Sequence, residues 1–293
     1  MKTPLLTVFT PAYNRAYTLP RTYESLRAQN CKDFLWLIVD DGSSDNTAEL
    51  VKEWQASDNG FEIRYIYKEN GGMHTAHNTA YANIDTELNV CIDSDDALAP
   101  DAVRKIADAW SKVRNIGYAG LLGLDAQFDG TVIGTGFPAD LIETTMDGYY
   151  RSGGRGDKKL VLRTDVVREY PPYPTFDGEK FVPLGSLYTM IDQKYKLYIV
   201  NEVLCLVEYM ADGSTKNMFR QYYRNPKGFR YGRLVTLETD VTFKRKLILY
   251  IHYTAESILA KEPILKDAPS KFLGCISVPF GALLALYIKF RCK

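Results

Sequence analysis

Short apolar runs alternate with segments of helical spacing along the first hundred residues. Four of these runs have the length of buried strands, at residues 5–10, 34–39, 61–67 and 87–92. Each is followed by a segment with apolar side chains every three or four positions, as in Leu19, Tyr23 and Leu26 after the first run. That spacing predicts a helix with one apolar face. The alternation of strand and helix predicts an α/β fold with an open, doubly wound, mostly parallel sheet.

Beyond residue 115 this alternation loosens. Apolar runs recur at residues 117–125, 158–167 and 196–209, but Gly-rich and Pro-rich joints separate them, and the last seventy residues have the spacing of helices. We therefore predict three regions. Residues 1–115 and 116–215 form the two halves of one α/β domain, and residues 216–293 form a helical extension.

Composition is typical of an ordered protein in a reduced compartment. Lys plus Arg and Asp plus Glu both total 36, so no net charge favours nucleic acid as a partner. The five cysteines are scattered without a CxxC spacing, and Cys91 lies inside an apolar run. These positions indicate a cytosolic setting rather than a disulfide framework.

Charge is unevenly placed near the C-terminal end of the sequence. Residues 216–246 hold nine Lys or Arg and two acids, whereas residues 272–288 hold no charged residue. Seventeen residues is the lower limit for a helix that spans a bilayer, and we expect Pro279 and Gly281 to interrupt it. A buried core helix is the alternative. The basic flanks favour contact with an anionic membrane surface.

Polar clusters follow three of the predicted strands. They are residues 10–15 (TPAYNR), 40–47 (DDGSSDNT) and 93–96 (DSDD). Each alone is an ordinary turn or helix-cap signal. In open α/β sheets, however, ligands bind beyond the carboxyl ends of the strands, and the three clusters fall at such ends. Together they predict a ligand site at one edge of the sheet.

The third cluster sets Asp93, Asp95 and Asp96 within four positions, where their charges repel one another. They are either solvated turn residues or the surroundings of a hard divalent cation such as Mg²⁺ or Mn²⁺, which takes oxygen ligands.

Two glycines and two histidines form a further motif at residues 70–78 (NGGMHTAHN). Gly71 and Gly72 let the backbone approach a ligand just before a helix N-terminus able to face an anion. His74 and His77 follow, three positions apart, but no third nitrogen or sulfur ligand stands at a suggestive spacing, so zinc is not expected. We interpret both histidines as pocket or helix-surface residues.

These motifs resemble those of the family 2 glycosyltransferases with the GT-A fold, the nucleotide-diphospho-sugar transferases. The resemblance rests on residues 7–29, 37–47, 70–78 and 91–96, in that order, and a later block at 176–185 (FDGEKFVPLG) extends it to about residue 210. It implies a GT-A type, Rossmann-like sheet and a metal-dependent transferase that uses a UDP-sugar.

The resemblance also implies roles for individual residues. Asp41 would hydrogen-bond the uracil ring, and Asp96, together with Asp95, would bind Mn²⁺ or Mg²⁺. His77 stands where relatives often carry Arg, a position that admits a diphosphate contact. The implied nucleotide-binding residues are Thr10, Pro11, Ala12, Tyr13, Asp41, Gly72, Asn78, Asp93 and Asp95.

An inverting transferase needs a base that takes the proton of the acceptor hydroxyl. The resemblance places this acid just before the helix that follows the block at 176–185, where Leu184 stands instead. Leucine cannot accept a proton. The neighbouring acids are the candidates for the base, each with a plain surface residue as the alternative: Asp177, Glu179 and Asp192, with Asp157 more distant.

We therefore expect an inverting hexosyltransferase that moves a sugar from a UDP-sugar to a glycan or lipid-linked acceptor in bacterial cell-surface polysaccharide synthesis. We expect it in the cytoplasm, peripheral on the inner face of the cell membrane. One alternative is a nucleotide-sugar-binding protein without turnover, which Leu184 favours. Another is a sugar-nucleotide pyrophosphorylase, for which residues 10–15 lack the glycine-rich loop.

Overall fold

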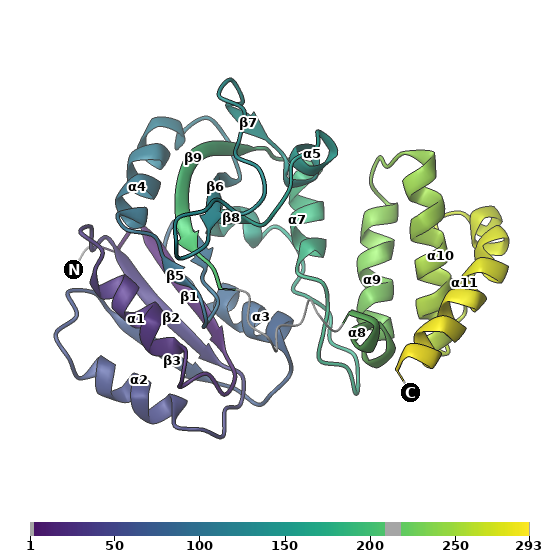
Figure 1. Ribbon diagram of the computed structural model, residues 1–293, viewed down its shortest axis with the longest axis horizontal. Coiled ribbons are helices and arrows are strands. Elements are labelled where there is room, and N and C mark those ends of the chain that lie inside the picture. Colours follow the sequence, from purple (N-terminus) through teal and green to yellow (C-terminus); the bar gives the residue numbers. More distant parts are fainter. Residues whose placement is uncertain (1–2, 209–217, 293) are drawn as a thin grey trace. The chain divides into compact units, whose positions relative to one another are not determined.

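The computed structural model describes residues 3–208 and 218–292, which fold into two compact units (Figure 1). The first, here the sheet unit, comprises residues 3–171 and 194–208. The second, the helical unit, comprises residues 172–193 and 218–292. The regions predicted from the sequence divide the chain differently, because residues 172–193 pack with the C-terminal helices rather than with the sheet.

The sheet unit contains the predicted strands and helices, with short additions. Its strands are β1 (Leu6–Ala12), β2 (Phe34–Asp40), β3 (Ile63–Tyr67), β4 (Leu88–Cys91), β5 (Ala97–Leu98), β6 (Gly120–Ala126), β7 (Glu143–Thr144), β8 (Lys158–Arg163) and β9 (Leu197–Leu206). Its helices are α1 (Leu19–Arg27), α2 (Thr47–Gln55), α3 (Met73–Asn83), α4 (Ala102–Val113), α5 (Met146–Arg151) and α6 (Thr164–Val167). The strands expected from the four apolar runs are confirmed as β1 to β4.

The strands form one sheet in the order β3-β2-β1-β4-β8-β6-β9-β5, with β7 paired to β9. Strands β3, β2, β1 and β4 run parallel to one another. Strand β8 is antiparallel to both β4 and β6, and β9 is parallel to β6. The carboxyl ends of β1 to β4, β6 and β9 therefore lie at one edge, together with the start of β8. We call this the ligand edge.

Helices cover both faces of the sheet, which explains why β1 and β2 are buried along their whole length. On one face, Tyr23 of α1 stacks on Trp54 of α2 with ring centroids 4.3 Å apart, and Trp36 of β2 lies beneath them. On the other face, α3 sets Ala76 and Ala80 against the remaining β1 and β2 side chains. This core fixes the strand ends that carry the polar clusters.

The helical unit is built from α7 (Gly185–Asp192), α8 (Met218–Arg224), α9 (Pro226–Leu237), α10 (Phe243–Ala260) and α11 (Lys271–Arg291). The core between α9, α10 and the start of α11 includes Leu237, Tyr250 and Tyr253. The hydroxyl of Tyr253 donates to the carbonyl of Ile264 at 2.8 Å, and that of Tyr250 accepts from the amide of Ser270 at 2.6 Å. The loop before α11 is thereby tied to α10.

The interruption that we expected in the last apolar segment does not occur. Helix α11 continues through Pro279 and Gly281. Gly281 is needed for packing, because a Cβ there would lie 2.5 Å from the Thr254 side chain of α10. The hydroxyls of Thr254 and Ser277 also meet at 2.6 Å. Close contact with α10 therefore stabilises a helix that Pro and Gly alone would weaken.

Candidate functional site at the ligand edge

The three polar clusters do come together at the ligand edge, and hydrogen bonds join the first two. The side-chain oxygen of Asn14 accepts from the amide of Ser44 at 2.8 Å, and the amide of Asn14 donates to the Ser43 hydroxyl at 2.8 Å. Asp45 accepts from the amide of Ala16 at 3.1 Å. The loops after β1 and β2 therefore form one polar surface.

The first cluster places its residues at different depths. Thr10, Pro11 and Ala12 are buried in the end of β1, whereas Tyr13 is 50% exposed. The hydroxyl of Thr10 accepts from the indole nitrogen of Trp36 at 3.0 Å. Its side chain is thus committed to the core, and Tyr13 is the member of this group whose ring is open to a ligand.

Asp41 is the most heavily bonded residue of the second cluster. Its carboxylate accepts from the amides of Gly71 at 2.9 Å and Gly72 at 2.7 Å, and the Lys68 ammonium lies 2.5 Å away. The residue is only 4% exposed. Asp41 therefore ties the end of β2 to the glycine motif, a structural duty that the sequence alone did not indicate.

The third cluster follows β4 and is partly buried. Burial raises the pKa of Asp96 to about 7, with the charges of Asp93 and Asp95 adding to the rise and Lys159 opposing it. Burial and Asp93 raise the pKa of Asp95 as well. The Thr22 hydroxyl holds the Asp96 carbonyl at 2.7 Å, and Arg21 donates to the Asp95 carbonyl.

This cluster has the chemistry expected for a divalent cation. Its donors are carboxylate oxygens, and a positive ion would offset both the burial and the repulsion that raise the pKa of Asp96. Within the described residues no three His, Cys, Asp or Glu side chains converge on one point. An ion of the Mg²⁺ type needs only one or two carboxylates, because phosphate oxygens and water complete its shell.

The two histidines are core residues, which corrects our interpretation of them as pocket or helix-surface residues. His74 is 2% and His77 1% exposed. The His77 ring meets Phe9 edge-on at 5.0 Å and lies 3.7 Å from the Cys91 sulfur. Burial lowers the pKa of His77 to about 3, so the ring is neutral and offers no positive charge to a diphosphate. Asn78 lies beside it on α3, half-buried.

Residues 7–123 match the sequence model described as glycosyl transferase family 2. This segment, less than half of the chain, carries the likeness to family 2 of the glycosyltransferases. The matched residues include all three polar clusters and the glycine motif, so the ligand edge is the part of the chain that carries the family pattern.

Two curated relatives are synthases much longer than this chain. The hyaluronan synthase of Pasteurella multocida is 31% identical over 136 residues, which are 46% of this chain and 14% of that protein. The chondroitin synthase of Escherichia coli is 32% identical over 136 residues, 46% of this chain and 20% of that protein. The chain therefore spans no more than a fifth of the length of either relative.

Solved structures support the GT-A fold. The S. aureus TarS fragment 1-349 in complex with UDP-GlcNAc has a TM-score of 0.61 at 15% identity, covering 98% of this chain and 88% of that chain. The mannosyltransferase PcManGT of Pyrobaculum calidifontis, in complex with GDP-Man and Mn2+, has a TM-score of 0.56 at 17% identity, covering 100% and 81%. At these identities the likeness concerns the fold alone.

The candidate bases lie in the helical unit, outside the matched segment. Leu184 directly precedes α7, so no carboxylate occupies the expected position. Glu179 accepts from the amides of Lys227 at 3.0 Å and Gly228 at 2.9 Å, in the first turn of α9. Asp192 is the last residue of α7, and Asp177 is exposed. Of the three candidates, Glu179 thus already has a helix-capping role.

Two residues of the ligand edge, Asp125 and Lys159, were not predicted from the sequence. Asp125, near the end of β6, is 3% exposed, and Lys159, near the start of β8, lies 4.0 Å from it. In the sequence, Asp125 ends the apolar run 117–125, and Lys159 stands near the start of the run 158–167. Only the strand order β4-β8-β6 brings them to the acid cluster, and no local signal announces that order.

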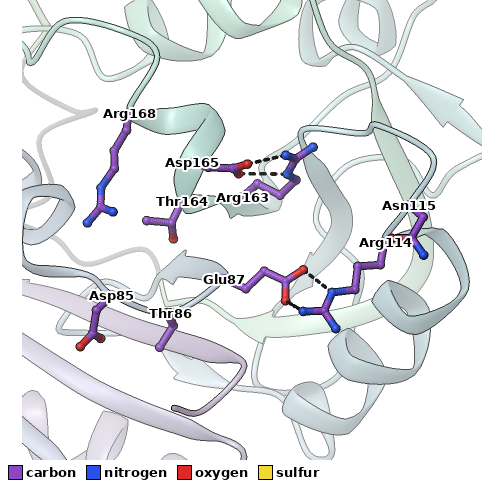
Figure 2. A pocket seen from close by; sticks show the side chains of 9 residues that line it. All are labelled: Asp85, Thr86, Glu87, Arg114, Asn115, Arg163, Thr164, Asp165 and Arg168. Carbon is purple, nitrogen blue, oxygen red and sulfur yellow. Dashed lines mark hydrogen bonds and ion pairs between the residues drawn. The ribbon is translucent and has the colours of Figure 1, made fainter. Parts of the chain in front are cut away.

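A cavity of about 350 Å³ lies at the opposite edge of the sheet, before β4 and after β8 (Figure 2). Its arginines are largely neutralised: Arg114 pairs with Glu87, and Arg163 pairs with Asp165 through two hydrogen bonds. Arg168 donates to the Ile84 carbonyl. The cavity is therefore separate from the ligand edge, and its charges are largely balanced.

Proposed function

We propose that the protein is an inverting glycosyltransferase that moves a sugar from a UDP-sugar to a glycan or lipid-linked acceptor in bacterial cell-surface polysaccharide synthesis. The observation that carries the proposal is the ligand edge, where a family 2 segment brings the loop after β1, Asp41 and the acid cluster to one side of one sheet. Such an edge is where open α/β sheets bind their ligands.

The donor is proposed to lie with its base near Tyr13 and Asp41 and its diphosphate near Asp93, Asp95 and Asp96. The TarS neighbour was solved with UDP-GlcNAc and the PcManGT neighbour with GDP-Man, so the fold accommodates either nucleotide. The choice of uridine is supported by the family pattern around Asp41. In this chain that carboxylate already accepts two backbone amides, and one of its oxygens also faces Lys68.

Asp95 and Asp96 would hold a Mn²⁺ or Mg²⁺ ion. When bound, the ion would neutralise the charge that develops on the departing diphosphate. The chain's own contribution is to fix the two carbonyls of this pair through Arg21 and Thr22, so that their carboxylates leave the strand end in a set direction.

The base is proposed to be Asp177, Glu179 or Asp192, and Asp177 is the best candidate. Its carboxylate is exposed and makes no hydrogen bond or ion pair within residues 3–208 and 218–292, whereas Glu179 is held by α9. The base would take the proton of the acceptor hydroxyl while that oxygen bonds to the anomeric carbon and the bond to the diphosphate breaks.

We also propose that α11 contacts an anionic membrane from the cytoplasmic side. Within the described residues only α11 is long and apolar enough to cross a bilayer, and 28% of its most apolar stretch is buried. A soluble core helix of this composition would be mostly buried. Phe272, Leu283 and Phe290 are 72%, 65% and 76% exposed. Helix α11 holds no acid, and Lys271, Lys289 and Arg291 flank its apolar centre.

A direct test is to incubate the protein with Mn²⁺ and a panel of UDP- and GDP-sugars and to follow release of the nucleoside diphosphate. We expect one UDP-sugar to be turned over, with loss of turnover in EDTA and in Asp96→Asn. The competing function, a nucleotide-sugar-binding protein, is favoured by Leu184. It predicts that a donor raises the melting temperature while no donor is ever consumed.

A further inference from the structure

Lys159 projects a positive charge into the acid cluster from a strand that the cluster does not belong to. Lys159 belongs to β8, which lies between β4 and β6, and it pairs with Gly123 of β6. Because β8 starts at the ligand edge, the Lys159 side chain begins there. The ammonium donates to the carbonyl of Cys91 at 3.4 Å, two residues before Asp93. Its side chain is 13% exposed.

Asp125 fixes this ammonium from the other side. One of its carboxylate oxygens lies 4.0 Å from the Lys159 nitrogen. That oxygen is buried and accepts no hydrogen bond within the described residues, and the ammonium of Lys159 is a positive charge that faces it. Burial lowers the pKa of Lys159, but the charges of Asp125, Asp96 and Asp93 outweigh it, and its pKa stands well above the usual value.

The neighbouring Lys158 shows that this placement is specific. Successive residues of a strand point to opposite faces, and the Lys158 ammonium donates to backbone carbonyls instead. Its acceptors are the carbonyls of Ile133, Arg155, Gly156 and Asp157, at 3.0 to 3.3 Å. Of two adjacent lysines, one therefore holds a loop and the other faces carboxylates.

We propose that Lys159, positioned by Asp125, is a built-in counter-cation of the acid cluster and competes there with a divalent ion. The ammonium lies 4.0 Å from Asp125 and donates to the Cys91 carbonyl at the end of β4, directly before the acid cluster. Carboxylates removed from water in this way need a positive charge close by. Lys159 supplies that charge whether or not an ion is bound. It thereby keeps the cluster assembled between turnovers and limits the affinity for the ion.

Lys159→Met tests both consequences. In EDTA at neutral pH its melting temperature should fall by about 10 °C, because a buried carboxylate loses its partner. Its Mn²⁺ dissociation constant, measured by calorimetry, should be about tenfold lower than that of the wild type, because a repelling charge is gone. Asp125→Asn combined with Lys159→Met should recover part of the lost melting temperature.

Lys158→Met is the matched control, since it removes one positive charge from the adjacent position. It should lower the melting temperature through its lost carbonyl contacts but leave the Mn²⁺ affinity within about twofold of the wild type, because its ammonium faces no cluster carboxylate. If Lys159→Met does not fold, the double variant carries the Mn²⁺ titration.

The metal part rests on the proposed function, and the outcomes separate the two. If Asp96→Asn abolishes Mn²⁺ binding but Lys159→Met binds Mn²⁺ no more tightly than the wild type, the counter-cation proposal is wrong and the metal site stands. If the wild type binds no Mn²⁺, the metal site is wrong. In that case the melting temperatures in EDTA test the counter-cation role alone. A Lys159→Met melting temperature equal to that of the wild type would refute the pairing of Lys159 with the carboxylates.

Discussion

At the scale of single residues, Asp41 combines a proposed ligand contact with a structural duty. Asp41→Ala would leave two partly buried amides, those of Gly71 and Gly72, without an acceptor and the Lys68 ammonium without its carboxylate partner. We expect a loss of about 2–4 kcal/mol in the free energy of unfolding, besides weaker UDP binding. Thermal unfolding without nucleotide measures the first effect. The exposed Asp58→Ala is the control, and an Asp41→Ala melting temperature equal to that of the control would contradict the structural role.

Glu256 of α10 predicts a pH dependence of stability in the helical unit. Burial raises its pKa from the usual 4.5 to about 7, although Arg233 lies 3.3 Å away and opposes the rise. Between these values the folded protein binds a proton that the unfolded chain has released, so this residue makes stability fall as pH rises through the window. Glu256→Gln should gain about 1–3 kcal/mol at pH 8 and little at pH 5. Equal gains at both pH values would show that Glu256 is not the titrating group.

Residues differ in how far the sequence reveals them. Asp93, Asp95 and Asp96 are adjacent in sequence and follow one strand, so their clustering could be predicted. The pairing of Asp125 with Lys159 could not be predicted, because Lys159 belongs to β8 and β8 lies between β4 and β6 in the sheet. The burial of His77 on α3 was missed for a similar reason, since Phe9 of β1 and Cys91 of β4 enclose its ring.

At the scale of elements, strands β1 to β4 were predictable because helices cover both faces and leave continuous apolar runs. The two-residue strands β5 and β7 carry no such run, since their pairing with β9 depends on where β9 already lies. The continuity of α11 was missed because a sequence displays Pro279 and Gly281 but not the Thr254 side chain that Gly281 accommodates.

Helix α9 offers a test that separates capping from catalysis. Glu179 accepts two amides in its first turn, so Glu179→Ala should lower the free energy of unfolding by about 1–2 kcal/mol. Its turnover number should stay within a few-fold of the wild type. Asp177→Asn should do the reverse, losing about 10²- to 10⁴-fold in turnover at an unchanged melting temperature. Thermal unfolding and single-substrate kinetics on both variants decide. A large loss of turnover in Glu179→Ala without loss of stability would make Glu179 the base.

At the scale of the whole molecule, the two units divide the proposed work between donor and membrane. The family 2 match and the ligand edge belong to the sheet unit, whereas α11 belongs to the helical unit. We expect α11 to lie along the membrane surface rather than to cross it. Its inner face, with Ser277 and Gly281, is packed on α10. If α11 crossed the bilayer, either its contact with α10 would be lost or the charged start of α10 would enter the bilayer with it. Burying those charges is costly.

Leu283→Glu with Leu286→Glu tests this arrangement, since both side chains are exposed, at 65% and 63%. Each buried leucine contributes about 1.5–3 kcal/mol to membrane binding, so the double variant should no longer sediment with anionic vesicles. The wild type should sediment, and alkaline carbonate should release it because it does not span. Ile116→Glu with Ile142→Glu is the matched control, with both residues 64% exposed in the sheet unit, and it should sediment like the wild type.

Both double variants should keep UDP binding and donor hydrolysis, which depend on the ligand edge. Only the α11 variant should lose transfer to a lipid-linked acceptor, by about tenfold or more, while transfer to a water-soluble acceptor persists. Resistance of the wild type to carbonate would instead make α11 a spanning helix, and vesicle binding by the α11 variant would place the membrane surface elsewhere on the chain.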